Sequence, residues 1–95
     1  MAKKNNVVEM YTVHIFHESY REAMTPRMVD MIKRHHGYVT AKSKDPMLFC
    51  ISIAFRKKKQ AKAFFNDCRG FLNAALDLSP SYMKRKYLRE EDKND

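Results

Sequence analysis

Alternating hydrophobic and polar positions predict a long β-strand over residues 7–17. Successive side chains of a strand point to opposite faces of a sheet. Val13 and Ile15 therefore fall on one face, and His14 and Phe16 on the other. The β-branched and aromatic residues in this stretch fit a half-buried strand.

Three further strands are predicted. Residues 47–55 alternate most clearly, and the side chains expected to face the core are Phe49, Ile51, Ile53 and Phe55. Residues 38–42 form a short strand, joined to 47–55 by the turn-forming residues 43–46. A last strand is expected over residues 82–88.

Helical spacing predicts a first helix that begins after Thr25 and ends at Gly37. Threonine suits the N-cap, proline suits the first helical position, and glycine suits the C-terminal stop. A capping box at Ser19 and Glu22 leaves two alternatives. Either the helix begins earlier and bends at Pro26, or residues 18–24 form a separate turn.

A second helix is expected over residues 60–78, where apolar residues recur at spacings of three and four. Gly70 lies inside this range, where it would allow close approach to the sheet. Ser79 and Pro80 would end the helix. The apolar stripe comprises Ala61, Phe64, Phe65, Cys68, Leu72, Ala75 and Leu76.

The expected order of elements is β-α-β-β-α-β, which predicts an α+β fold of the ferredoxin-like type. In that fold a four-stranded antiparallel sheet carries both helices on one face. Residues 7–89 would form this single domain. Residues 1–6 would be a flexible basic N-terminal tail, and residues 90–95 an acidic C-terminal tail.

The charge is strongly basic: 19 lysines and arginines against 11 acids give a net charge of +8. Such a balance favours partners that carry many negative charges. No apolar run is long enough to span a bilayer, and two cysteines are too few for a disulfide framework. We therefore expect a cytoplasmic protein with reduced thiols and no membrane partner.

Four consecutive cations, Arg-Lys-Lys-Lys at 56–59, lie at the expected N-terminus of the second helix. The helix dipole disfavours cations there, whereas the free N–H groups favour an anion. In the predicted topology this turn shares one end of the domain with the end of the first helix. The residues expected to bind nucleic acid or another anion are Lys33, Arg34, His36, Arg56, Lys57, Lys58, Lys59, Lys84 and Lys86.

Two features complicate this patch. The 90–95 tail carries four acids and one lysine, and it starts at the same end of the domain, where it could neutralise part of the patch. The basic residues before Gly37 also close a helix C-terminus, where cations are favourable in any protein.

The open face of the sheet offers a second surface. His14 and Phe16 are the side chains expected to stack on bases or to contact a partner. The stacking aromatics of RNA-recognition motifs are missing from strand 47–55. Met10, Phe16, Leu48 and Cys50 would form an apolar strip suited to dimerisation.

No catalytic or metal-binding pattern is present. His14 and His17 are three apart in a strand and point to opposite faces, and His35 and His36 are adjacent on a helix. We expect Cys50 and Cys68 on opposite sides of the sheet, without a disulfide and without a histidine base nearby. No cofactor and no enzymatic activity are expected.

These patterns favour a small non-enzymatic protein that binds RNA or DNA through phosphate contacts at one end of the domain. The alternative is a protein-interaction module, such as an adaptor, inhibitor or subunit. It would dock an acidic protein surface or form a homodimer through its open sheet face.

Overall fold

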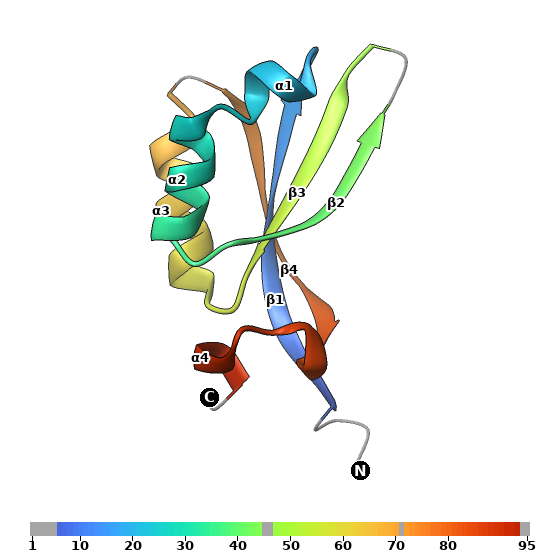
Figure 1. Cartoon of the computed structure of the whole chain (residues 1–95), viewed down its shortest axis with the longest axis vertical. Helices are drawn as coiled ribbons and strands as arrows, with labels where there is room; N and C mark the ends of the chain where they lie inside the picture. Colours follow the sequence, from blue (N-terminus) through green and yellow to red (C-terminus); the bar gives the residue numbers. More distant parts are fainter. Residues whose placement is uncertain (1–5, 45–46, 71, 94–95) are drawn as a thin grey trace.

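A four-stranded antiparallel sheet is the frame of this α+β protein (Figure 1). The computed structural model describes residues 6–44, 47–70 and 72–93. In spatial order, β2-β3-β1-β4, the strands are β2 (Tyr38–Lys44), β3 (Phe49–Phe55), β1 (Val7–His17) and β4 (Asn73–Lys84). In the part of the chain that is described, no helix is long and apolar enough to cross a membrane.

Two helices, α2 (Pro26–Arg34) and α3 (Lys58–Cys68), cover one face of the sheet (Figure 1). Each helix contributes a buried apolar stripe that meets the inward side chains of β1 and β3, as the sequence predicts. This main core contains Val13, Ile15, Ile51, Ile53, Phe55, Met28, Met31, Ile32, Ala61, Phe64 and Cys68.

Residues 20–23 form a short helix of their own, separate from α2. Helix α1 (Tyr20–Ala23) begins at Ser19, whose side chain accepts a hydrogen bond from the Glu22 N–H at 3.3 Å. Thr25 then returns to an extended conformation and caps α2 by accepting from the Met28 N–H at 3.2 Å. The separate-turn alternative is therefore correct.

The expected helix over residues 60–78 is wrong in its second half. Helix α3 ends at Cys68, and β4 begins at Asn73 and continues to Lys84. The expected strand over 82–88 is displaced accordingly, because residues 85–87 form a 3₁₀ turn, η2 (Arg85–Tyr87). Gly70 does not bring the helix close to the sheet, since a Cβ there would meet nothing within 4 Å.

Pairing with β1 explains the early end of the helix. As a strand, this segment half-buries alternate residues and completes the hydrogen bonds along the free edge of β1, with Ala74 opposite Ile15 and Leu76 opposite Val13. Pro80 is tolerated because β4 is an edge strand and a bulge interrupts the ladder between Met10 and Thr12.

The chain after β4 turns back across the lower sheet and ends in helix α4 (Glu90–Lys93). Leu88 packs in a second small cluster with Val8, Met10 and Ala54. Met10 is only 1% exposed. The expectation that Met10 belongs to an uncovered apolar strip is therefore wrong, because the C-terminal segment covers this end of the sheet.

Candidate functional site

The N-terminus of α3 presents three exposed lysines, at positions 57–59. Lys57 is the extended N-cap residue, and its N–H donates to the Gln60 Oε1 at 3.2 Å. Among the described residues, no side chain accepts a hydrogen bond from the first-turn N–H groups of α3, and no acid lies in its first turn. The site therefore combines concentrated positive charge with the positive end of a helix dipole.

Tyr11 of β1 lies directly beside these lysines. The Lys58 ammonium is 5.4 Å from the centre of the Tyr11 ring, within the range of a cation–π contact. The Tyr11 hydroxyl donates to the Glu9 carboxylate at 3.2 Å. Loss of solvent around the ring, followed by this hydrogen bond, raises the pKa of Tyr11 above its ordinary value.

The lower half of β4 continues this surface. Tyr82 pairs with Glu9 and Lys84 pairs with Val7. Paired residues of antiparallel strands share a face of the sheet, so Tyr82 and Lys84 lie on the same side as Glu9. Tyr82 is 62% exposed.

We call this surface the lysine–tyrosine face. Arg56 joins it to the sheet, because its guanidinium donates to the Glu9 carbonyl at 3.3 Å. The residues of the face are Tyr11, Arg56, Lys57, Lys58, Lys59, Tyr82 and Lys84.

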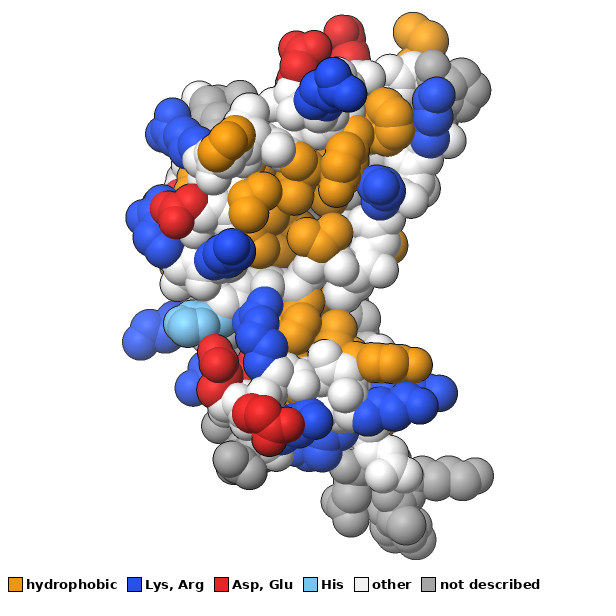
Figure 2. Space-filling model, in the orientation of Figure 1, with side chains coloured by type: hydrophobic (Ala, Val, Ile, Leu, Met, Phe, Trp, Pro, Cys, Tyr) orange, Lys and Arg blue, Asp and Glu red, His pale blue; other side chains and the backbone are white. Residues whose placement is uncertain are grey.

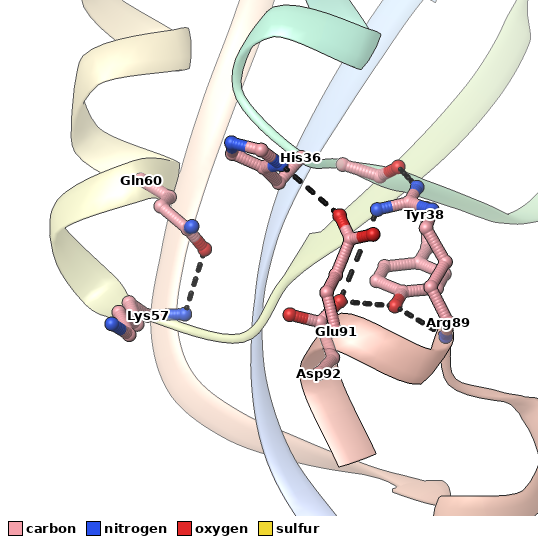
Figure 3. A network of polar contacts seen from close by, with 8 residues as sticks. His36, Tyr38, Lys57, Gln60, Arg89, Glu91 and Asp92 are labelled. Atoms are coloured by element: carbon pink, nitrogen blue, oxygen red, sulfur yellow. Dashed lines mark hydrogen bonds and ion pairs between the residues drawn. The ribbon is translucent and has the colours of Figure 1, made fainter. Parts of the chain in front are cut away.

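Two of the three predicted residues at the end of α2 contact acidic residues. His36 Nδ1 lies 3.7 Å from the Glu91 carboxylate of α4 (Figure 3). Arg34 pairs with Asp30 of its own helix at 3.1 Å. Lys33 is exposed and lines a pocket beside β2. The structure thus divides the predicted patch into two regions.

A polar network holds α4 in this position (Figure 3). The Tyr38 hydroxyl donates to the Asp92 carboxylate and accepts from the Arg89 N–H at 3.0 Å. The Arg89 guanidinium stacks 3.9 Å from the centre of the Tyr38 ring and donates to the Gly37 carbonyl. Burial, followed by the hydrogen bond to Asp92, raises the pKa of Tyr38.

Lys86 lies beyond β4, in the 3₁₀ turn, and its ammonium is 5.3 Å from the Tyr87 ring centre. Together with Lys84 and Arg85 it lines a small hollow beside Val7. This basic hollow adjoins the lysine–tyrosine face through Lys84.

His14 and Phe16, the predicted stacking pair, are not brought together with the lysines. They lie on the other face of β1, and Phe16 is five residues from Tyr11, about 17 Å along a strand. His14 Nδ1 is 3.0 Å from the Ser52 Oγ. Phe16 lines a pocket with Leu48 at the opposite end of the domain.

The two cysteines are free and differ in environment. Cys50 lies 3.9 Å from His14 Nδ1, so the expectation of no histidine nearby is wrong for this thiol. Cys68 belongs to the main core, and burial raises the pKa of its thiol to about 11. Within the described residues, no group of three or more His, Cys, Asp or Glu side chains could hold a metal ion.

Tyr11 and Tyr82 are site residues that the sequence did not single out. The alternation of β1 places Tyr11 on the helix-covered face, which suggests a core residue. It is only partly buried because β3 ends opposite it, at Phe55. Tyr82 could not be paired with Glu9 from the sequence, because the bulge near Pro80 sets the register.

Comparisons of this chain with models of protein families, with curated proteins and with solved structures give no match. The function is therefore inferred from the geometry of the lysine–tyrosine face.

Proposed function

We propose that this protein is a non-enzymatic nucleic-acid-binding protein that holds single-stranded RNA or DNA on the lysine–tyrosine face. The observation that carries the proposal is the group of exposed lysines at 57–59, of which Lys58 contacts the Tyr11 ring, on the face of the sheet that also carries the exposed Tyr82. Proteins that bind single strands combine a basic surface that follows the backbone with aromatic rings that stack on bases.

The charges and the rings have separate roles in this proposal. The lysines of α3 and Lys84 would contact phosphates, and the helix N–H groups would add donors. Tyr82, with most of its surface exposed, would stack on a base. Single strands are favoured over duplexes because only unpaired bases can reach a flat ring on an open surface.

Glu9 opposes binding on this face. Its carboxylate lies beside Tyr11 and opposite Tyr82. A phosphate that approaches the lysines would be repelled by this negative charge. The proposal therefore predicts that Glu9→Gln increases affinity, since glutamine keeps an acceptor for Tyr11 but removes the charge.

The test is the affinity for fluorescein-labelled oligo(U) and oligo(dT), measured by fluorescence anisotropy. Lys57/Lys58/Lys59→Ala should weaken binding by at least about tenfold, and Tyr82→Ala should cost about 1–3 kcal/mol of binding free energy. Glu9→Gln should strengthen binding.

The matched control removes three charges elsewhere. Arg21, Lys42 and Lys44 are exposed cations on α1 and β2, and Arg21/Lys42/Lys44→Ala lowers the net charge by the same amount. If this control weakens binding as much as the α3 variant does, the interaction follows net charge and the lysine–tyrosine face is not the site.

We further infer that the domain is an extended form of the ferredoxin-like fold. The strand order β2-β3-β1-β4 and two helices on one face support this inference, with α1, η2 and α4 as additions. A cytoplasmic location is proposed on the ground that both cysteines are free.

A further inference from the structure

Strand β2 forms one edge of the sheet. It pairs with β3, and in the described part of the chain no other strand pairs with its outer side. Every residue of β2 after Tyr38 is exposed. An exposed edge of this kind presents backbone N–H and C=O groups to which an extended chain can add.

A pocket of about 510 Å³ lies between this edge, helix α2 and the C-terminal segment. Its walls are mostly apolar, and Figure 2 shows hydrophobic side chains gathered on this face of the molecule with lysines and arginines around them. Val39 of β2 is 47% exposed at this pocket. The apolar lining residues are Met24, Val29, Ile32, Val39, Met83 and Tyr87.

The rim of the pocket is basic. Lys33 of α2 and Arg89 of the C-terminal segment line it. Along β2, Lys42 pairs with Ile51 and Val39 pairs with Ile53, so both side chains lie on the helix-covered face of the sheet. The Lys42 ammonium rests 4.3 Å from the centre of the Tyr20 ring, directed along the same side of the edge.

We propose that this groove binds an extended acidic peptide, which adds to β2 as a fifth strand. An apolar side chain of the peptide would enter the pocket beside Val39, and acidic side chains at alternate positions would meet Lys42 and Lys33. Strand addition takes its affinity from backbone hydrogen bonds and its specificity from pockets for alternate side chains.

Charge selects this occupant over a second copy of the chain. Each copy carries a net charge of +8, and its β2 edge carries Lys42 and Lys44. Lysines on an edge strand disfavour pairing between identical edges. The same lysines favour a strand of opposite charge. This proposal does not depend on the lysine–tyrosine face, which is formed by the start of α3, by β1 and by the opposite edge strand, β4.

The experiment uses the full chain and a fluorescein-labelled peptide of alternating valine and aspartate, with binding followed by anisotropy. Val39→Glu should weaken binding by at least about tenfold, because it fills the pocket with a charge that repels the peptide. The matched control is Leu78→Glu on β4, where a hydrophobic residue is 46% exposed. This control should bind as the unmodified chain does.

A second peptide tests strand addition itself. N-methylation at alternate backbone nitrogens removes the hydrogen bonds that an added strand needs, so this peptide should not bind. Equal binding of the methylated peptide, or equal losses in Val39→Glu and Leu78→Glu, would overturn the proposal.

Two further results would also overturn it. A dimer that forms with increasing concentration and is lost in Val39→Glu would assign the groove to a second copy. Loss of oligo(U) binding in Val39→Glu, with no peptide binding to the unmodified chain, would assign the groove to nucleic acid.

Discussion

At the level of single residues, the end of α2 shows that His36 and Gly37 have different roles from those expected of a helix-ending glycine. Gly37 is expected to supply the left-handed conformation that ends the helix, but His36 has the positive φ, 61°. The Gly37 N–H reaches back to the Ile32 carbonyl at 2.8 Å, and the His36 N–H to the Lys33 carbonyl at 3.0 Å. These two bonds form a Schellman motif. Gly37 is instead required because a side chain at this position would collide with the core.

Gly37→Ala should destabilise the protein by about 1–3 kcal/mol, because overpacking a core displaces its neighbours. A Cβ at this position would lie 2.8 Å from the Ile53 side chain and 2.9 Å from the Phe55 side chain. Urea denaturation measures the change. Gly70→Ala is the control, and it should cause no loss of stability, since its Cβ would meet nothing within 4 Å. Equal losses in both variants would contradict this reading.

The two thiols should react at very different rates. With a pKa of about 11, Cys68 is thiolate in only about one molecule in a thousand at pH 8, and it is fully buried. Ellman's reagent should therefore label one thiol quickly and the second only after denaturation. Cys50→Ser should remove the fast phase; a fast phase that survives this substitution would mean that the core around Cys68 opens readily.

At the scale of elements, the sequence predicts β1, β3 and α2 closely, because their alternation or helical spacing fits one structure. Residues 72–78 fit two structures, a helix and a strand. Leu72, Ala75 and Leu76 suit a helix, whereas Leu72, Ala74 and Leu76 suit a strand. The edge of β1 favours the strand, and this contact between distant segments has no local signal. The position of helix α4 also depends on a contact between distant segments. The Tyr38 hydroxyl donates to Asp92 of α4, which lies 54 positions further along the sequence.

Tyr38→Phe should loosen α4 and destabilise the protein by about 1–3 kcal/mol at pH 7, because the buried Asp92 carboxylate loses a donor. The Asp92 side chain is only 12% exposed. Folding raises the pKa of Tyr38, so the stabilisation by its phenol is complete below pH ~10, the pKa of tyrosine in the unfolded chain. This stabilisation is lost as the pH rises through the higher pKa that Tyr38 has in the folded protein.

Thermal melts of the unmodified chain and of Tyr38→Phe between pH 7 and 11 measure this dependence. The difference in stability between the two should be constant up to pH ~10 and should shrink above it. Tyr87→Phe, at an exposed tyrosine of the same segment, is the control and should show neither effect. A difference that grows above pH ~10 would contradict the assigned role of the phenol.

At the scale of the whole molecule, the sequence locates the cations of 56–59 at the start of a helix, and the structure agrees. The division of the basic end into two regions cannot be predicted from the sequence. That division depends on where α4 docks, because docking brings the Glu91 carboxylate to 3.7 Å from His36 Nδ1 at the end of α2 (Figure 3). The sequence also cannot place Tyr82 beside Glu9 on the lysine–tyrosine face, because the register of β4 depends on a bulge. We propose that the α3 half, the lysine–tyrosine face, is the functional surface.

The salt dependence of binding measures how many phosphates the lysine–tyrosine face contacts. The affinity for oligo(U) should fall steeply as salt rises, with a slope of log K against log salt of about −0.7 for each phosphate neutralised. Lys57/Lys58/Lys59→Ala should make that slope shallower by about 2, one such step for each lysine removed. Binding that is absent at low salt, or a slope unchanged by the substitution, would contradict the account.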